Sequence, residues 1–152
     1  MTIEKQPGDI RGSNQQSATA NRQGVEVSAA LIFRGGKILI TQRHAGAHLG
    51  GLWEFPGGKR EPDETFEQCL VRELREELGV ESTIGELFDE VTHTYPEKTV
   101  QLKFFICRLE GGEPQPIGCA AVKWVGKAEL NNHDFPAADA RLLDKLHAYD
   151  FP

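Results

Sequence analysis

The sequence predicts an α/β protein in which a mixed sheet is flanked by helices. Three observations lead to this prediction: alternating apolar residues early in the chain, one strongly patterned helix in its middle, and a second helical segment near its end. Extended segments lie between the two helices, and this order is typical of a sheet with helices packed on it. A chain of 152 residues with 39% hydrophobic content can bury one sizeable core.

The first expected strands follow a polar segment. Residues Met1–Gly24 are rich in Gln, Asn, Ser, Thr and Gly and have almost no apolar periodicity, which predicts a flexible tail. Alternation begins at Val25 and continues to Phe33, and the turn residues Arg34-Gly35-Gly36 lead into a second strand over Lys37–Arg43. Since no repeat or composition change follows, we expect residues 25–152 to form a single domain.

The central helix is predicted over Phe66–Leu78. Thr65 and Gln68 have the spacing of an N-terminal capping box, and Gly79 stands where a left-handed C-terminal cap is common. An apolar stripe at helical spacing predicts the buried face, and it consists of Leu70, Leu74 and Leu78.

The remaining elements follow this helix. Two strands are expected over Glu81–Thr94 and Thr99–Leu109, separated by the turn Tyr95-Pro96-Glu97. A short strand is expected over Ala121–Val125, and a last helix over Ala137–Ala148.

Three glutamates on the central helix indicate a metal site. Glu73, Glu76 and Glu77 are spaced i, i+3 and i+4, so their Cβ atoms are neighbours at about 5–6 Å and their charges repel. Two of them lie in the last turn, against the negative end of the helix dipole, so that a cation is needed. Oxygen ligands without His or Cys favour Mg²⁺ or Mn²⁺. The alternative is a solvated acidic helix face.

This helix lies within a longer motif, Gly58-(five residues)-Glu64-(seven residues)-Arg72-Glu73-Leu74-Arg75-Glu76-Glu77-Leu78-Gly79-Val80. The motif resembles the complete signature of the Nudix hydrolases. The resemblance implies an α/β/α sandwich with a mixed central sheet, a loop-helix-loop Nudix box, and cleavage of a nucleoside diphosphate linked to another moiety. It also implies that Glu73, Glu76 and Glu77 bind the catalytic metals with the Gly58 carbonyl, that Arg72 orients a carboxylate, and that Glu64 has a supporting role.

Outside the box, the chain is similar to the MutT branch, whose members hydrolyse oxidised purine nucleoside triphosphates. The matching segments are Arg43, Ala47-His48, Leu52 to Lys59, Tyr95-Pro96, Val100, Leu102 and Asp134 to Ala138. The resemblance implies that Arg43 contacts phosphate or base and that Lys59 lies near the triphosphate. The base pocket would be walled by Val25, Val27, Tyr95, Val100 and Leu102, with Phe135 and Asp139 beside it.

Each pocket assignment has a structural alternative. Alternating Val and Leu residues on strands are core residues more often than ligand contacts. His48 stands in a polar loop bounded by glycines, where a mobile contact with the ligand and a solvated surface residue are equally compatible with the sequence.

Asp139 departs from the MutT prototype, which has an asparagine there. An ionised Asp can only accept hydrogen bonds, so it suits the N7 hydrogen of an oxidised guanine and opposes O6, whereas a protonated Asp, with its pKa raised by burial, regains a donor. An acceptor also suits N4 of cytosine, and related pyrophosphohydrolases acting on cytidine triphosphates carry Asp here. Asp139 could instead cap the last helix.

A second departure concerns the general base. Some family members place another glutamate before the last strand, but Ile117-Gly118-Cys119 offers no acid, and Glu113 would reach the site only if the loop folded back. The base is therefore expected to be Glu76 or Glu77. The expected reaction is attack of a metal-activated water on the β-phosphorus, which releases a nucleoside monophosphate and pyrophosphate.

Composition sets the expected partners. The net charge of −6 argues against a polynucleotide ligand but not against a single nucleotide. We expect a monomer or weak dimer in the cytoplasm, with no membrane partner and with Cys69, Cys107 and Cys119 reduced in the core. The ranked functions are an 8-oxo-dGTP diphosphatase, a CTP or dCTP pyrophosphohydrolase, and a non-catalytic nucleotide sensor, with an ADP-ribose hydrolase as a weaker enzymatic alternative. Because all box glutamates are present, the sequence favours an enzyme.

Overall fold

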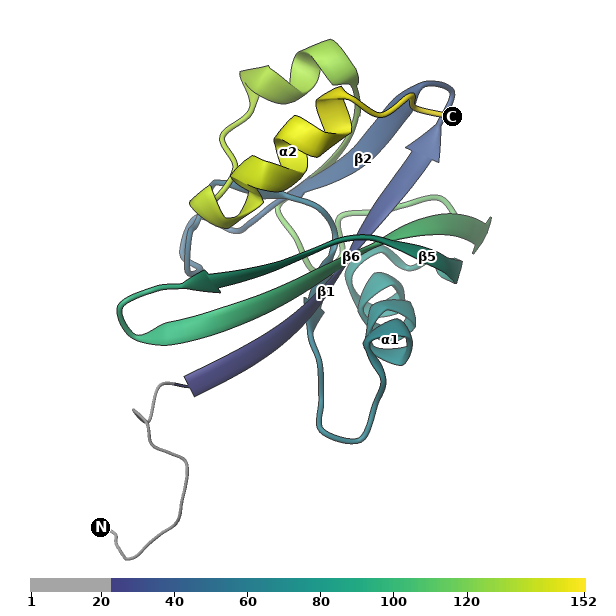
Figure 1. The fold of residues 1–152 in the computed structure, drawn as a ribbon. Coiled ribbons are helices and arrows are strands. Elements are labelled where there is room, and N and C mark those ends of the chain that lie inside the picture. The colour runs from purple at the N-terminus through teal and green to yellow at the C-terminus, as the bar shows by residue number, and fades with distance from the viewer. Residues whose placement is uncertain (1–22) are drawn as a thin grey trace, which may run out of the picture.

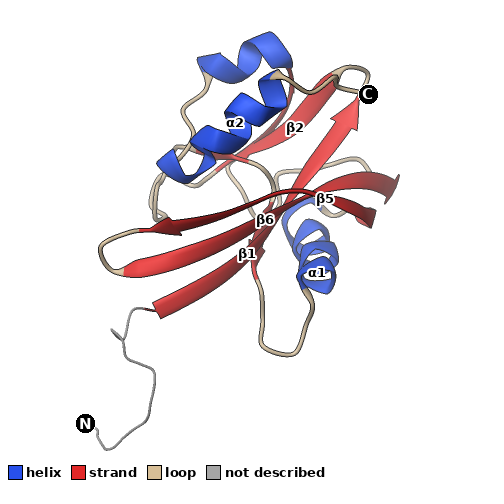
Figure 2. Ribbon diagram, viewed as in Figure 1, coloured by secondary structure: helices blue, strands red, loops and turns tan. Residues whose placement is uncertain are grey.

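A seven-stranded mixed sheet with helices on both faces organises residues 23–152, which are the residues described by a computed structural model (Figures 1 and 2). Apart from its last two residues, the predicted tail lies outside the described residues. The strands are β1 (Gln23–Arg34), β2 (Lys37–Gln42), β3 (Trp53–Glu54), β4 (Gly57–Lys59), β5 (Glu81–Thr94), β6 (Lys98–Gly111) and β7 (Ala121–Gly126). The helices are α1 (Phe66–Leu78), the 3-10 helices η2 (Lys127–Asn132) and η3 (Ala137–Asp139), and α2 (Ala140–His147).

Strand β1 is the centre of the sheet. It runs parallel to β6, and β6 forms a long antiparallel hairpin with β5. The order is β3-β2-β1-β6-β5, with β4 paired to β1 and β7 paired to β2. The sheet is therefore mixed, as the sequence predicts.

The two faces of the sheet bury two separate apolar clusters. Ala29 and Leu31 of β1 pack with Leu142 and Leu146 of α2, while the alternate residues of β1 pack with the leucine stripe of α1. This alternation follows from the period of two along a strand. The helices α1 and α2 accordingly lie on opposite sides of the sheet (Figure 2), which confirms the predicted sandwich.

The central helix has the predicted bounds and caps. Thr65 Oγ1 accepts a hydrogen bond from the Gln68 amide at 3.0 Å, and Gln68 Oε1 accepts one from the Thr65 amide at 2.9 Å. Gly79 ends the helix at φ 69°, a left-handed conformation that suits glycine. These caps fix the helix that carries the box glutamates.

Several predicted boundaries differ from the structure, most of them by one or two residues. The last helix is shorter than expected because residues 137–139 form the 3-10 turn η3. Strand β6 extends from Lys98 to Gly111, beyond both predicted ends. The short elements β3, β4 and η2 were not predicted, since two or three residues show no periodicity and are set by the strands they pair with. Within the described residues, no helix is long and apolar enough to cross a membrane.

Candidate active site

Two adjacent glycines in β4 allow the backbone before α1 to lie very close to β1 and to Glu73. A Cβ atom at Gly57 would lie 1.9 Å from the Ser28 carbonyl oxygen, and one at Gly58 would lie 2.2 Å from Cδ of Glu73. At Gly57 the neighbour is backbone, so only glycine permits the approach, whereas at Gly58 any added Cβ would displace the Glu73 carboxylate. The backbone of β4 therefore lies directly against the carboxylate of Glu73, with the Gly58 carbonyl 3.5 Å from the thiol of Cys69.

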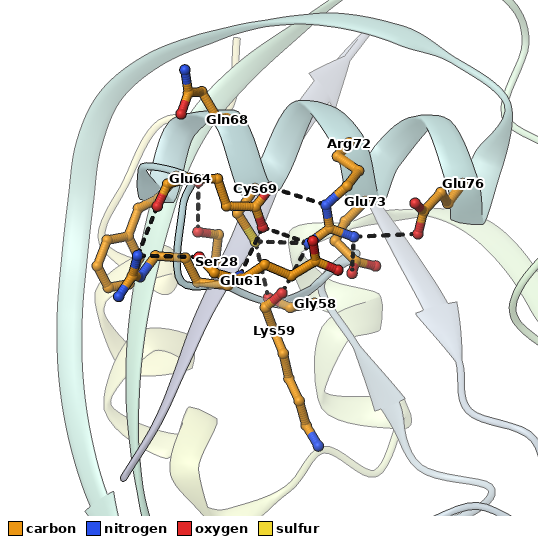
Figure 3. Close-up of polar contacts among 12 residues, drawn as sticks. Ser28, Gly58, Lys59, Glu61, Glu64, Gln68, Cys69, Arg72, Glu73 and Glu76 are labelled. Carbon is orange, nitrogen blue, oxygen red and sulfur yellow. Dashed lines mark hydrogen bonds and ion pairs between the residues drawn. The ribbon is translucent and has the colours of Figure 1, made fainter.

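Arg72 joins the acidic residues of this site (Figure 3). Its Nε and Nη2 donate to the two carboxylate oxygens of Glu64 at 3.0 and 2.6 Å. Its Nη1 donates to Glu73 at 2.9 Å and to Glu76 at 3.3 Å, and Nη2 also reaches the Lys59 carbonyl at 3.0 Å. The hydrogen bonds from Arg72 lower the pKa of Glu64 to about 2. Glu64 thus holds the guanidinium in place, and Arg72 orients Glu73 and Glu76.

The three box glutamates have different surroundings. The side chain of Glu76 is 62% exposed, whereas that of Glu73 is 18% exposed. Glu77 Oε1 is buried and has no hydrogen-bond partner among the described residues. Burial, and then the charges of Glu54 and Glu73, raise the pKa of Glu77 to about 8. Burial also raises the pKa of Glu73, against the opposing effect of Arg72.

These residues fit a hard divalent cation. The donors are oxygens alone, and the unpaired Glu77 oxygen is a buried acceptor that lacks a positive partner. In residues 23–152, however, no three His, Cys, Asp or Glu side chains converge into a preassembled cluster. Arg72 occupies one oxygen each of Glu73 and Glu76, so the guanidinium supplies part of the positive charge that the helix face requires.

Glu54 is a further acidic residue of the site that the sequence analysis did not single out. It lies in β3, lines the cavity described below, and pairs with Arg43 at 3.1 Å. Burial raises its pKa, and its charge in turn raises those of Glu77 and Asp139. The sequence indicated Glu54 only through its place in the Trp53-Glu54-Phe55-Pro56 segment. A single glutamate beside aromatic residues has no spacing that would identify it as part of a site.

A cavity of about 170 Å³ extends from this loop along β1 and β6. It is lined by all the predicted substrate-contacting residues except Phe135, and by Gly58 of strand β4. These residues are Val25, Val27, Arg43, His48, Lys59, Tyr95, Val100, Leu102 and Asp139. The alternation of β1 and β6 brings their apolar side chains to one face, so an apolar pocket adjoins the loop that precedes the glutamate-bearing helix.

The expected place of Phe135 requires correction. Its ring stacks on Phe55 with centroids 5.3 Å apart and an interplanar angle of 24°, and it packs against the core beside α2. Pro136 and Ala138 line the cavity in its stead. Phe135 therefore supports Phe55 from behind and does not face the cavity.

Asp139 is buried in the cavity wall, with 4% of its surface exposed. Although it occupies the N-cap position of α2, its side chain makes no capping hydrogen bond. The capping role is therefore not realised. Burial, and then the charge of Glu54, raise the pKa of Asp139 to about 7. Burial and the charge of Asp139 raise the pKa of Tyr95, which shares the cavity.

The loop after β2 folds over the cavity. Arg43 Nε donates to the His48 carbonyl at 2.6 Å, and Leu49 takes a left-handed φ of 57° where it lines the cavity. His48 is exposed yet reaches the cavity, with its ring 6.4 Å from that of Tyr95 and edge-on to it. Arg43 therefore binds both this loop, through the His48 carbonyl, and the carboxylate of Glu54.

The loop before β7 places backbone amides, and no acid, at the end of α1. The amides of Ile117 and Gly118 donate to the Glu77 carbonyl at 3.1 and 3.0 Å, which satisfies the last turn of the helix. Glu113 pairs with Arg34 at 2.9 Å and is 64% exposed. Glu113 is thus held by β1 and does not replace the missing loop glutamate.

A helix face of glutamates bound by one arginine, beside an apolar cavity, suits a hydrolase of phosphoric anhydrides, and the comparisons with known proteins support that class. Residues 28–145 match the family described as NUDIX domain. The chain is 41% identical over 124 residues to a CTP pyrophosphohydrolase of Escherichia coli (strain K12), which covers 82% of this chain and 92% of that protein. It is 38% identical over 110 residues to an 8-oxo-dGTP diphosphatase of the same organism, which covers 72% and 85%.

A solved structure supports the same assignment. The solution structure of the E. coli ORF135 protein superposes with a TM-score of 0.73 at 38% identity, covering 87% of this chain and 94% of that one. The chain belongs to the NUDIX family, as a hydrolase similar to its MutT-like members. Hydrolases of this family generally use divalent metals.

Proposed function

We propose that the protein is a Mg²⁺-dependent nucleoside triphosphate pyrophosphohydrolase that acts on 8-oxo-dGTP. The observation that supports this most directly is the continuous cavity, which has Gly58 and Lys59 at one part of its wall and the buried Asp139 at another. A nucleotide lying in it would place phosphates at the box and its base against Asp139. Mn²⁺ is expected to substitute for Mg²⁺, because both accept oxygen ligands.

The residues of the box would hold the metal through Glu73, Glu76, Glu77 and the Gly58 carbonyl. Bound Mg²⁺ would neutralise phosphate charge and lower the pKa of a water. Lys59 meets the triphosphate, and Arg72 keeps Glu73 and Glu76 oriented. The water oxygen bonds to the β-phosphorus while the bond to the oxygen bridging to the α-phosphate breaks, so that the products are a nucleoside monophosphate and pyrophosphate.

Glu77 is our choice for the group that takes the proton from this water. Its Oε1 is buried and free of hydrogen bonds, whereas Glu76 is exposed and bound to Arg72. A carboxylate whose pKa is raised toward neutrality is a better general base near neutral pH.

Asp139 would read the base. With a pKa raised to about 7, its carboxyl exists in both protonation states near neutral pH. The protonated form donates to O6 of an oxidised guanine, and the ionised form accepts from its N7 hydrogen. Val25, Val27, Tyr95, Val100 and Leu102 would wall the base.

A CTP or dCTP pyrophosphohydrolase is the second candidate. The ionised form of Asp139 accepts a hydrogen bond from N4 of cytosine, and the adjacent charge of Glu54 also suits an amino group. The relative named CTP pyrophosphohydrolase supports this candidate.

Steady-state kcat/KM with Mg²⁺ for 8-oxo-dGTP, dGTP, CTP, dCTP and ADP-ribose, at pH 6 and pH 8, tests the proposal. A preference for 8-oxo-dGTP over dGTP is expected, and protonation of Asp139 should make the ratio of 8-oxo-dGTP to CTP higher at pH 6. A preference for the cytidine nucleotides at both pH values would establish the second candidate. Hydrolysis of ADP-ribose alone would contradict both.

The remaining biological assignments accompany this function. We infer that residues 25–152 are one catalytic domain and that it works as a monomer or weak dimer, because Leu87 and Ile117 are the exposed large apolar side chains among the described residues. The free, buried thiols of Cys69, Cys107 and Cys119 and a nucleotide substrate favour the cytoplasm.

A further inference from the structure

Asp89 is a buried acid that the proposed mechanism does not use. It lies in β5, where the pairing with β6 is interrupted by register shifts between Ile84 and Asp89, and 6% of its surface is exposed. Its Oδ2 is buried and has no hydrogen-bond partner among the described residues. A buried carboxylate with an unpaired oxygen is costly for stability, so its position invites a functional explanation.

The other carboxylate oxygen of Asp89 ties β5 to the start of α2. Arg141 Nη2 donates to Asp89 Oδ1 at 3.0 Å, and Lys145 Nζ lies 3.8 Å from the same atom. Lys145 also donates to the Phe88 carbonyl at 2.5 Å. Since Arg141 and Lys145 are one helical turn apart, both cations fasten the same face of α2 to the strand.

This attachment lies two residues from Asp139. The turn η3 ends at Asp139, α2 begins with the next residue, and β5 lies against η3. Figure 1 shows the first turn of α2 next to the β5–β6 hairpin. Asp139 has no capping hydrogen bond of its own to fix its side chain. Its place in the cavity wall is therefore set by how η3 and α2 are seated.

We propose that Asp89 is a positioning residue for base selection: through Arg141 and Lys145 it seats the start of α2 so that Asp139 meets the base. Asp89 does not line the cavity and would not touch the nucleotide. This inference rests on the proposed role of Asp139 as the base reader.

The test compares Asp89→Asn with wild type by the ratio of kcat/KM for 8-oxo-dGTP and dGTP. The variant keeps the shape of the side chain and removes the charge that binds the two cations. We expect the ratio to fall by about 2- to 30-fold, the range of coupling effects at a distance. The loss should appear in KM for 8-oxo-dGTP with kcat little changed, because the box on α1 is untouched.

A second variant and a matched control keep the result interpretable. Arg141→Gln alters an exposed partner, with 70% of its side chain accessible, so it leaves the core intact and should reproduce the shift. Glu81→Gln neutralises an acid of the same strand whose exposed pair with Arg75, at 2.7 Å, lies away from α2. It should leave the ratio unchanged. In Asp89→Asn and Arg141→Gln, but not in Glu81→Gln, hydrogen exchange at the Asp139 and Ala140 amides should be faster than in wild type.

Asp139→Ala, measured in parallel, distinguishes failure of the positioning role from failure of the proposed function, because alanine can neither donate nor accept a hydrogen bond. If Asp139→Ala changes the ratio while Asp89→Asn and Arg141→Gln leave it at the wild-type value, the positioning role is overturned and the proposed function stands. If Asp139→Ala also leaves the ratio unchanged, Asp139 is not the base reader and both are overturned. An equal loss of kcat for both substrates would show that Asp89 is merely structural.

Discussion

Arg43 Nη1 lies 3.1 Å from Oε1 of Glu54, while Nε of the same arginine donates to the His48 carbonyl at 2.6 Å. Arg43, which is expected to contact the substrate, thus already binds an acidic side chain and a loop that line the cavity. Arg43 lowers the pKa of Glu54, but burial outweighs it and raises that pKa overall. The charge of Glu54 contributes to the raised pKa of both Asp139 and Glu77, so it links the electrostatics of the cavity wall to that of helix α1.

Glu54→Gln is expected to lower the pKa of Asp139 from about 7, because one of the two causes of the raised value is removed. Side-chain carbon NMR titration of Asp139 in the metal-free protein measures this directly. Glu113→Gln is the matched control, since Glu113 also pairs with an arginine but is exposed and outside the cavity. An Asp139 pKa that stays the same in Glu54→Gln would show that the two carboxyl groups do not interact.

Glu77→Gln should reduce kcat by about 10²- to 10⁴-fold, the usual contribution of a positioned general base. The fold should persist, and the metal-free variant should be slightly more stable near neutral pH, because glutamine replaces a carboxyl group whose ionisation is opposed by burial and by the charges of Glu54 and Glu73. Glu67→Gln serves as the control, since Glu67 lies exposed in the first turn of the same helix. Ordinary turnover by Glu77→Gln would remove Glu77 from the mechanism.

Gly58→Ala should abolish most activity, because the added Cβ would lie 2.2 Å from Cδ of Glu73 and must displace that carboxylate. Because the clash is with the end of a side chain that can swing away, urea unfolding should show a smaller loss of stability than the ~1–3 kcal/mol of core overpacking. Gly46→Ala is the control: nothing lies within 4 Å of its added Cβ. Equal activity for the two variants would mean that Gly58 does not need to be glycine.

The metal-free protein should lose stability as pH rises. The pKa of Glu77 is raised from 4.5 to about 8, so the folded state retains a proton that the unfolded state releases within this window. Its contribution is fully present below pH 4.5 and lost by about pH 8. Asp139 acts in the same sense between pH 3.8 and about 7. Each group lowers the free energy of unfolding by at most about 1.4 kcal/mol per pH unit.

Urea unfolding with EDTA between pH 5 and pH 8 checks this slope. Glu77→Gln should make it shallower, since only Asp139 and the other carboxyl groups with raised pKa values, Glu54 and Glu73, then contribute, and Mg²⁺ should restore stability to wild type at pH 8. A wild-type protein whose stability rises over this range without metal would contradict the raised pKa values.

The sequence predicted the elements that periodicity and caps determine. Helix α1 and strand β5 have the expected bounds, since their signals lie within the segments themselves. Strands β3 and β4 escaped prediction because their partners in β2 and β1 hold them extended. Phe135 was misplaced for a similar reason: neighbouring residues of one segment face either the cavity or Phe55, and only tertiary packing decides between them.

Within the candidate site, the acidic box followed from its spacing, but the contacts between residues did not. Glu54 is separated from the box in sequence and reaches Asp139 and Glu77 only through the fold. Likewise, the role of Arg72 as a partner of three glutamates depends on side-chain geometry that no spacing rule specifies.

Hydrolysis of 8-oxo-dGTP in ¹⁸O-labelled water with Mg²⁺, with both products analysed by mass spectrometry, tests the central claim most directly. Attack at the β-phosphorus predicts unlabelled nucleoside monophosphate and pyrophosphate that carries one ¹⁸O atom, with no turnover in EDTA. Label in the monophosphate, or release of a nucleoside diphosphate and orthophosphate, would contradict the proposed reaction.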